Sequence, residues 1–281
     1  SVILIIYSIL TEQNIAKMFL CAFIPGLLAA LGYIVAISLY VRLNQNSGPI
    51  KDRVPWKDRM YLFKNIWHII LIFVVMIGGI YLGFFTPTEG AAIGAAGTGI
   101  IAITNKSFNI KSFIEVIEST AVTTGMIFFV LLGAEFFNSF IALTQLPNLL
   151  TEFSKENNLE PLIVVACIMI LYLFLGCLMD SLAMILLTIP VFFPLVMSLD
   201  FGLSSEETAI WFGILTLVVV EVGLITPPVG LNVFIINKMA KDVPIIDTFK
   251  GVIPFLLSDI IRIILLFSFP SITLIMLWAF Y

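Results

Sequence analysis

Long apolar segments, separated by short polar stretches, cover nearly the whole of this 281-residue chain. Many of them reach the roughly 20 residues that a helix needs to cross the hydrocarbon core of a bilayer. Helices satisfy their own backbone hydrogen bonds, which lipid cannot do. The pattern therefore predicts an all-α, polytopic membrane protein.

Charged residues, glycines and prolines divide the chain into expected elements. The first half is expected to contain a membrane helix over Ile15–Val41 kinked at Pro25-Gly26, a cytoplasmic loop over Arg42–Lys64, helices over Leu62–Leu82 and Gly90–Thr104, a short interfacial helix over Lys111–Ser119, and a span over Ala121–Leu143. The second half is expected to contain a polar loop with Glu152, Lys155, Glu156 and Glu160, a helical hairpin over Pro161–Ser198, a broken helix over Thr208–Ala240, and a terminal span over Pro244–Tyr281 with candidate kinks at Pro254 and Pro270.

Composition narrows the class of protein further. The chain is 60% hydrophobic and 11% charged, with a mean hydropathy of +1.13. The apolar segments leave no room for a soluble catalytic domain, and no basic patch points to a nucleic acid. Lysine and arginine crowd the loop over Arg42–Lys64, which places that loop in the cytoplasm by the positive-inside rule.

The broken helix is the clearest local signal. Thr226-Pro227-Pro228, flanked by Gly223 and Gly230, interrupts an apolar run that is long enough to span. Each proline removes a backbone donor and clashes with the preceding turn, so the helix is expected to split near mid-membrane. Exposed backbone is tolerated there only where it lines a protein cavity, and its oxygens can then hold a cation. A kinked packing helix is the alternative.

A second interruption lies within Pro161–Ser198, whose flanking loops are both acidic. Both ends are therefore expected on the external side. Two full spans with a tight cytoplasmic turn would satisfy this requirement, and so would a re-entrant hairpin whose tip stops inside the membrane. We favour the hairpin, because the turn Leu178–Ser181 has no lysine or arginine to mark a cytoplasmic surface.

Polar residues at these two interruptions suggest an ion site. A carboxylate in lipid costs roughly 2.5 to 3.5 kcal/mol on insertion scales, so Asp180 requires an explanation. Together with Ser181, the hydroxyl of Thr226 and the carbonyls of Gly223–Pro228, it can form an all-oxygen shell suited to Na⁺. Two helix amino termini point into the same cavity, where an anionic substrate can sit. The competing interpretation is that Asp180 only caps the second hairpin helix.

Other acidic residues have simpler interpretations. Glu89 follows a proline at a helix start and is expected to be an N-terminal cap. Asp259 and Arg262 are three residues apart and can pair on one helix face. Glu135 and Glu221 are either polar locks between helices or cavity liners.

Several segments together resemble the large membrane subunit of tripartite ATP-independent periplasmic (TRAP) transporters, the DctM family. The resemblance covers the whole chain and rests on Gly83–Ala92 (GFFTPTEGAA), Gly176–Ser181 (GCLMDS) with Pro190 and Pro194 after it, Gly223–Asn232 (GLITPPVGLN) and Gly251–Phe255 (GVIPF).

The resemblance implies an elevator-type transporter of two inverted repeats, each with a re-entrant hairpin and a broken helix, in the bacterial inner membrane. Na⁺ would drive it without a further cofactor, and a periplasmic substrate-binding protein and a small four-helix membrane subunit would be its partners. The implied Na⁺ ligands are Asp180, Ser181, Gly223, Thr226 and Pro228, and the candidates for the cavity of an organic-anion substrate, such as a dicarboxylate, are Asn232, Pro227 and Glu135.

Family members carry a first repeat with its own hairpin and its own Pro-Pro-Ser break, and this chain starts at the serine of such a break, Ser1. We therefore expect one repeat and the tail of the other, and we do not expect this polypeptide to transport alone. The expected divisions are 1–61, the tail of the first repeat with a membrane helix and cytoplasmic loop; 62–120, scaffold-type helices and the interfacial arm helix; 121–243, the transport-type region with the hairpin (161–198) and the broken helix (208–240); and 244–281, the terminal membrane helix.

Two other functions compete with this one. A stand-alone divalent-anion/Na⁺ symporter of related fold would need no binding protein. An intramembrane aspartyl protease would need two facing aspartates, but only Asp180 and Asp259 lie in apolar runs, and Arg262 is placed to pair with the latter. We therefore expect a transporter and not an enzyme. Its substrate is not named by the sequence, because a binding protein would select it.

Overall fold

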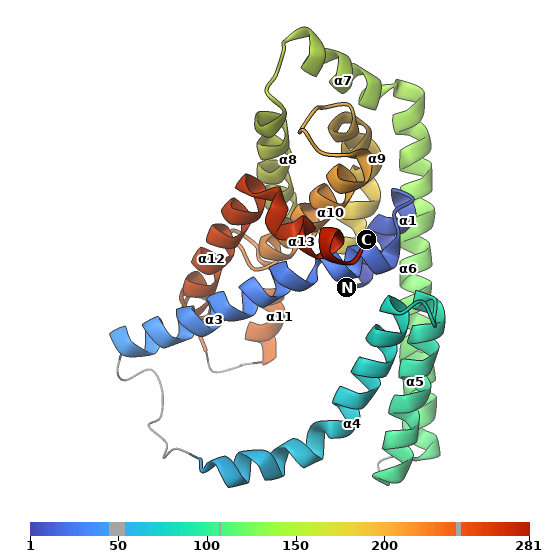
Figure 1. Cartoon of the computed structure of the whole chain (residues 1–281), viewed down its shortest axis with the longest axis vertical. Helices are drawn as coiled ribbons and strands as arrows, with labels where there is room; N and C mark the ends of the chain where they lie inside the picture. The colour runs from blue at the N-terminus through green and yellow to red at the C-terminus, as the bar shows by residue number, and fades with distance from the viewer. Residues whose placement is uncertain (45–53, 107, 240–242) are drawn as a thin grey trace. The chain divides into compact units, whose positions relative to one another are not determined.

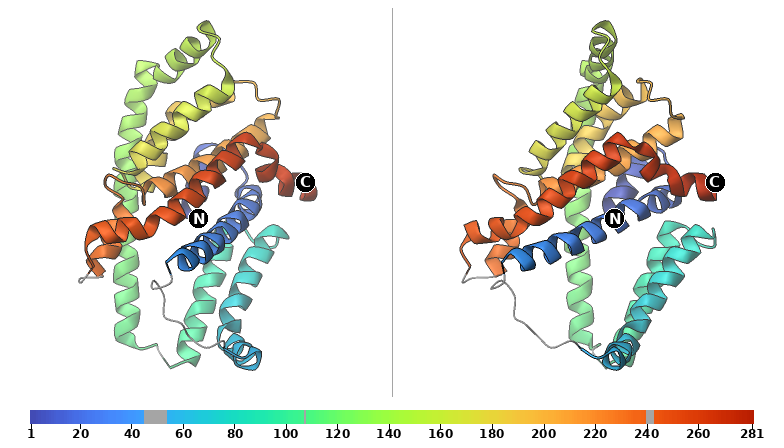
Figure 2. Two further views of the ribbon diagram at one scale, coloured as in Figure 1. Left: turned by 90° about the vertical axis from the view of Figure 1, so that its left-hand side faces the viewer. Right: turned by 60° about the vertical axis from the view of Figure 1, so that its left-hand side comes forward.

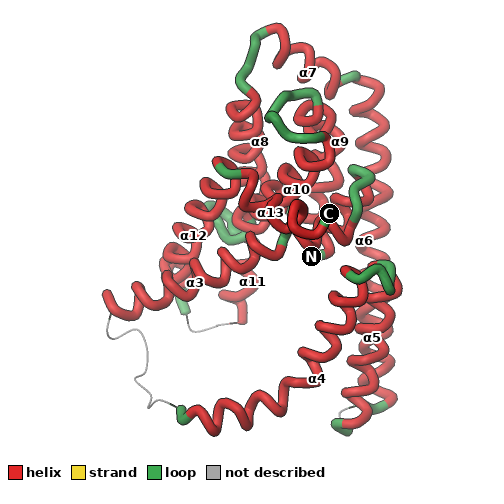
Figure 3. Tube along the Cα trace, viewed as in Figure 1, coloured by secondary structure: helices red, strands yellow, loops and turns green. Residues whose placement is uncertain are grey.

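The structure, a computed structural model, describes residues 1–44, 54–106, 108–239 and 243–281. Within these ranges every regular element is an α-helix (Figure 3). In chain order the helices, labelled in Figure 1, are α1 (Val2–Leu10), α2 (Ile15–Cys21), α3 (Phe23–Leu43), α4 (Trp56–Tyr81), α5 (Pro87–Thr104), α6 (Ile110–Thr144), α7 (Leu146–Glu156), α8 (Pro161–Gly176), α9 (Ser181–Met197), α10 (Ser205–Gly223), α11 (Leu231–Met239), α12 (Ile245–Ser268) and α13 (Pro270–Phe280).

Three helical segments of the described chain are long and apolar enough to cross a membrane. They are Ile15–Leu43, which comprises α2 and α3, together with α6 and α12. Four shorter helices are also apolar: Ile66–Tyr81, Pro161–Gly176, Ser181–Met197 and Pro270–Phe280. The prediction of an all-helical, multi-pass membrane protein is confirmed.

The chain divides into two compact units, one made of residues 1–45 and 130–281 and the other of residues 46–129. In the second unit, α4 and α5 pack through small residues of α5. A Cβ added at Gly90 would lie 2.8 Å from a methyl carbon of Ile80, and one at Gly94 would lie 2.9 Å from the sulfur of Met76. Because these positions carry no side chain, α4 approaches α5 closely. The predicted cap is also confirmed, since Glu89 closes a capping box at the start of α5.

The first unit is built around α10, in which every residue from Thr208 to Val220 is buried. A helix that is apolar on all sides is expected to be enclosed by other helices, and α1, α2, α8, α9, α12 and α13 all contact it (Figures 1 and 2). Polar tips inside this core find backbone partners. The Tyr7 hydroxyl donates to the Ala209 carbonyl at 2.7 Å, and the Trp211 indole donates to the Leu266 carbonyl at 2.9 Å.

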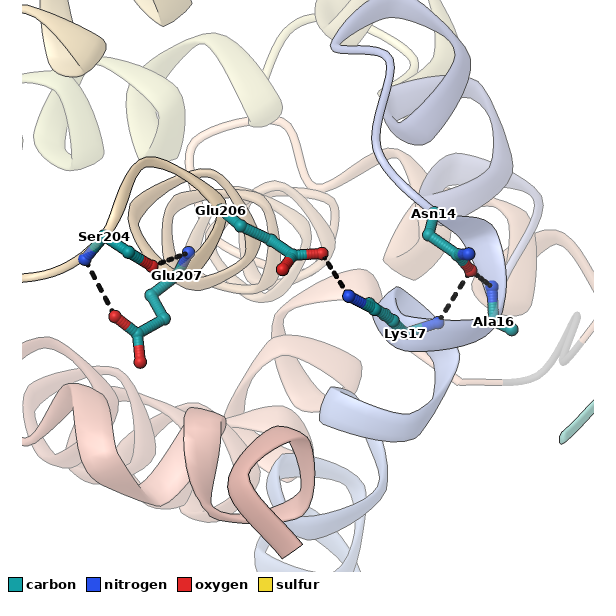
Figure 4. Close-up of polar contacts among 6 residues, drawn as sticks. All are labelled: Asn14, Ala16, Lys17, Ser204, Glu206 and Glu207. Carbon is teal, nitrogen blue, oxygen red and sulfur yellow. Dashed lines mark hydrogen bonds and ion pairs between the residues drawn. The ribbon is translucent and has the colours of Figure 1, made fainter. Parts of the chain in front are cut away.

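Polar contacts fix the amino-terminal end of α10. Ser204 and Glu207 form a capping box, and Lys17 of α2 pairs with Glu206 at 2.6 Å (Figure 4). The indole of Trp278 in α13 donates to the Glu207 carboxylate. Helices from both ends of the chain are therefore tied to the first turn of α10.

The predicted membrane helix over Ile15–Val41 is present but interrupted at Ala22, between α2 and α3. Pro25 lacks the N–H that would bond to the Cys21 carbonyl, so the expected kink becomes a boundary four residues earlier. The helix predicted from Leu62 begins already at Trp56. The predicted cytoplasmic loop is correspondingly shorter, and residues 45–53 of it lie outside the described ranges.

Two boundaries predicted for residues 111–160 differ in the structure. The interfacial helix Lys111–Ser119 and the span Ala121–Leu143 form one helix, α6, because only Thr120 lies between them and nothing there ends a helix. The predicted boundary between 120 and 121 therefore falls within a helix. The polar loop after residue 144 contains α7, which starts after a left-handed turn at Gln145 (φ 57°).

The terminal span over Pro244–Tyr281 is also two helices and not one. α12 ends at Ser268, Phe269 is non-helical (φ −129°, ψ 79°), and α13 starts at Pro270. The residue before a proline is excluded from helical geometry by the proline ring, and a proline is well suited to the first position of a new helix. Of the two candidate kinks, Pro254 stays within α12 and Pro270 becomes a helix start.

α3 and α12 lie side by side and run in opposite directions (Figures 1 and 2). The predicted pair between Asp259 and Arg262 is confirmed, with an Nη2–Oδ1 distance of 2.9 Å. Tyr33 of α3 donates its hydroxyl to the other carboxylate oxygen of Asp259 at 2.7 Å. Asp259 is 1% exposed, so a buried charge is neutralised where two apolar helices meet.

We predict that Asp259→Ala lowers the free energy of unfolding by about 3 to 5 kcal/mol, because it leaves Arg262 buried without a counter-charge. The matched control is Asp247→Ala, which breaks the exposed pair between Asp247 and Lys250 at the same spacing on the same helix, and its cost is about 0.5 kcal/mol or less. Denaturant unfolding in detergent micelles measures both. Equal costs would contradict the structural role of the buried pair.

α6 contacts the hairpin helix α9 through Asn138, whose side-chain amide donates to the Leu186 carbonyl at 3.4 Å. The need for this donor is local. Pro190, four residues after Leu186, lacks the N–H that would otherwise bond to that carbonyl within α9. An amide from a neighbouring helix therefore takes the place of a missing backbone donor.

We predict that Asn138→Ala costs about 1 kcal/mol of stability in the wild-type chain and close to nothing in a Pro190→Ala background, where residue 190 supplies the donor itself. A double-mutant cycle of unfolding free energies measures the coupling. Pro194→Ala is the matched control background, since its N–H would serve the carbonyl of residue 190 and the cost of losing Asn138 should persist. If the effects of Asn138→Ala and Pro190→Ala were additive, the Asn138 amide would not be replacing the backbone donor that Pro190 lacks.

Candidate functional site

The predicted hairpin is formed by α8 and α9, joined by the turn Cys177–Asp180. Asp180 is the N-cap of α9, and its Oδ2 accepts the Leu182 N–H at 3.0 Å. The capping role considered for Asp180 is therefore real. No described hydrogen bond or ion pair uses its Oδ1, so half of the carboxylate remains available for a ligand.

The predicted break separates α10, which ends at Gly223, from α11, which begins at Leu231. The peptide bond between Pro227 and Pro228 is cis, and Gly230 has a positive φ of 60° that favours glycine. Because residues 224–230 lie between the two helices, the alternative of a merely kinked helix is wrong. The predicted last residue of the broken helix, Ala240, lies outside the described ranges.

The break has an ordered internal structure. The Thr226 hydroxyl donates to the Val222 carbonyl at 2.6 Å, and the Asn232 N–H donates to the Leu224 carbonyl at 3.1 Å. A hydroxyl whose proton is used in this way presents its oxygen lone pairs to whatever else approaches. Thr226 is thus prepared as an acceptor and α11 is held against the end of α10.

Glycine brings the turn and the break together. A Cβ added at Gly223 would lie 2.7 Å from the Cα of Gly176, and one at Gly176 would lie 3.0 Å from the Cα of Gly223. The backbones of α8 and α10 therefore touch at the points where both helices end. Immediately beyond them, the Cys177 sulfur lies 3.5 Å from the Pro227 carbonyl oxygen, while it is closer, at 3.2 Å, to the Leu173 carbonyl oxygen of its own helix.

Backbone oxygens without protein partners gather around this contact. Among the hydrogen bonds of the described residues, none ends on the carbonyls of Leu178 or Met179 in the turn, or on those of Ile225, Thr226 and Pro228 in the break. A chain in lipid has no water to satisfy such oxygens. Oxygen ligands of this kind suit hard cations.

The predicted site residues are placed as follows. Gly223 is buried, Ser181 and Thr226 are half-buried, and Asp180 and Pro228 are exposed. Of the substrate-cavity candidates, Pro227 and Asn232 lie exposed in and after the break, whereas Glu135 lies on α6, and no described contact links it to the break.

Glu221 lies on α10, two residues before its end. Glu221 is exposed, and no hydrogen bond or ion pair of its side chain is described. The polar-lock and cavity-liner interpretations therefore both stay predictions.

Sequence reasoning missed two groups that build the site. Gly176 was part of a family motif but had no assigned role, although its place at the end of an apolar helix was a signal for close backbone approach. Asn138 was given no role in the sequence analysis. Its partner, the carbonyl four residues before Pro190, could have been predicted as one that needs a donor.

A multi-pass helical protein in which a discontinuous helix meets a helical hairpin has the architecture of secondary transporters, which bind ions at such interruptions. A family model described as "Tripartite ATP-independent periplasmic transporter, DctM component" matches residues 1–272. The chain belongs to this family. It is therefore related to transport permeases, and the alternative of an aspartyl protease is wrong.

Characterised relatives agree with the family assignment. The chain is 30% identical over 275 residues to the C4-dicarboxylate TRAP transporter large permease protein DctM of Pseudomonas aeruginosa, covering 98% of this chain and 62% of that protein. It is 28% identical to the sialic acid permease protein SiaM of Vibrio cholerae, with 98% and 63% covered, and 32% identical to the sialic acid permease protein SiaT of Haemophilus influenzae, with 97% and 43% covered. The chain thus spans less than two thirds of the length of each of these relatives.

We predict that Gly223→Ala destabilises the fold by about 1 to 3 kcal/mol, because the added methyl group has no space against the Gly176 backbone. Gly133→Ala is the matched control, since a Cβ there meets nothing within 4 Å and alanine favours a helix interior over glycine by about 1 kcal/mol. Thermal unfolding in micelles should therefore move in opposite directions for the two variants. A neutral Gly223→Ala would show that the two backbones do not depend on this contact.

Proposed function

We propose that this chain forms the Na⁺ site and part of the substrate cavity of a TRAP transporter large permease, which imports an organic anion by Na⁺ symport. The Na⁺ ligands are Asp180, Ser181, Gly223, Thr226 and Pro228. The transporter works by an elevator mechanism in the bacterial inner membrane, and the hairpin of α8 and α9 is re-entrant.

The observation that carries this proposal is the contact between Gly176 and Gly223. It joins the end of α8 to the end of α10, so that the turn and the break, which are far apart in sequence, share one small region. Each contributes carbonyl oxygens without a described partner. Neither segment alone would supply enough ligands for a dehydrated cation.

The side chains complete the ion shell. Asp180 keeps one oxygen free after capping α9, and Thr226 keeps its lone pairs free after donating its proton. One carboxylate among neutral oxygens gives a singly charged shell, which matches a monovalent cation. The cation in turn offsets the cost of holding a carboxylate at membrane depth.

Substrate recognition uses the helix ends. α9 and α11 both begin at this region, and the unsatisfied N–H groups of a helix amino terminus favour negative charge. The named substrates of the relatives, C4-dicarboxylates, sialic acid and isethionate, are all organic anions. An organic anion bound beside the cation would be stabilised both by the cation and by the helix ends.

An internal sequence match supports two inverted repeats. Ile24-Pro25 followed by Leu27-Leu28 in α3 matches Ile253-Pro254 followed by Leu256-Leu257 in α12. The antiparallel packing of α3 on α12 is what two copies of opposite topology would produce.

The family description and the relatives' names support the partners. A tripartite, periplasmic system implies a periplasmic binding protein that delivers the anion and a small membrane subunit beside the large one. The stand-alone symporter differs in needing no binding protein. Uptake into proteoliposomes with and without that protein distinguishes the two.

We predict that Asp180→Asn reduces uptake by the permease that contains this chain to the level seen without Na⁺. Asparagine caps a helix about as well as aspartate, so this substitution removes the charge and keeps the N-cap of α9. The measurement is the Na⁺ dependence of anion uptake by proteoliposomes supplied with the binding protein.

Asp200→Asn serves as the control for this experiment. Asp200 is an exposed carboxylate that follows α9 and accepts the Gly202 N–H, and its substitution should leave Na⁺ dependence intact. Unchanged Na⁺ dependence in Asp180→Asn would remove Asp180 from the ion site.

A further inference from the structure

α7 presents three different surfaces around its axis. At 3.6 residues per turn, Leu146, Leu150 and Ser154 share one side. Ser154 is buried, Leu150 packs against the core, and α7 contacts α9. This side of α7 is therefore covered by the hairpin helix.

The opposite side of α7 is polar. Asn148, Glu152, Lys155 and Glu156 are all exposed and occupy the half of the helix that faces away from α9. Charged side chains in this arrangement remain hydrated, so this side of α7 faces water.

A third strip lies between these two sides. Leu149 and Phe153 are one turn apart, and they are 55% and 59% exposed. Neither has a hydrogen-bonding group, and both border the face that packs on α9. An apolar strip between a packed face and a hydrated face is the geometry of a helix lying at a membrane boundary.

α6 shows where lipid lies at this end of the molecule. Its Leu132, Phe136, Phe140 and Leu143 form one exposed apolar stripe, whereas Ala134 and Ile141 are buried on the other side. α6 is one of the segments able to cross a membrane. An exposed apolar stripe on a segment of this length is suited to face lipid, and it continues to the last turn of the helix.

The chain turns immediately after that stripe. Gln145, in the left-handed conformation, separates α6 from α7 by a single residue, and α7 then crosses over α9 (Figure 1). α7 thus starts where the lipid-facing surface of α6 ends. Leu149 and Phe153 lie only about one and two turns beyond that point.

We propose that α7 is an interfacial anchor, with Leu149 and Phe153 inserted at the boundary between lipid headgroups and acyl chains and with Glu152 and Glu156 in water. The occupant of the apolar strip is the bilayer itself, since the strip continues the lipid-facing surface of α6.

Site-directed spin labelling tests the anchor. Leu149→Cys and Phe153→Cys, with Asn148→Cys and Glu152→Cys as matched exposed positions on the polar side, are made in a chain whose Cys21, Cys167 and Cys177 are replaced by alanine. The labelled proteins are reconstituted into vesicles of phosphatidylethanolamine and phosphatidylglycerol. Power saturation then compares collisions of each nitroxide with oxygen and with a water-soluble nickel chelate.

The anchor requires oxygen collisions to exceed nickel collisions at 149 and 153, and the reverse at 148 and 152. All four side chains are exposed, so the substitutions remove no core packing. Equal nickel access at all four positions would place the strip in water and overturn the proposal. Protection of 149 and 153 from both reagents would show that a protein surface covers the strip, which would also overturn it.

Discussion

The hydrocarbon core of a bilayer offers no hydrogen-bond partners. Backbone N–H and C=O groups freed where a helix is interrupted must therefore bond to another part of the chain or to a ligand. The carbonyl of Leu186, freed by Pro190, receives the amide of Asn138. At the amino terminus of α9, the Leu182 N–H donates to the carboxylate of Asp180. Around the turn and the break, several backbone oxygens have no described donor, and the proposed Na⁺ site rests on them.

Several buried or half-buried charged groups in the first unit are paired with an opposite charge. Lys17 and Glu206 pair at the amino-terminal end of α10, and Asp259 pairs with Arg262 in the contact between α3 and α12. Each of these charges is neutralised by another protein group. Asp180 has no such cationic partner among the described residues, so its charge is available to a mobile cation.

Local rules accounted for much of the fold. Prolines marked the break after Gly223, the start of α13 and the boundary at Ala22, although the last was expected as a kink. Apolar length identified the spans, and residue spacing identified the pair of Asp259 and Arg262. The errors arose where charged residues were taken to mark the end of a membrane helix. The amphipathic start of α6 suggested a separate helix, and the charges of α7 suggested a loop. In both places one helical face carries the polar residues.

The sequence by itself determined where helices stop, which residues cap them and that the chain lives in a membrane, because these depend on steric and solvation effects within a few residues. Only the tertiary structure decided that Gly176 meets Gly223, that Asn138 reaches Leu186 and that α10 is enclosed. Those contacts join segments distant in sequence. They result from the packing of whole helices, and the residues near each contact in the sequence do not indicate which helix will be its partner.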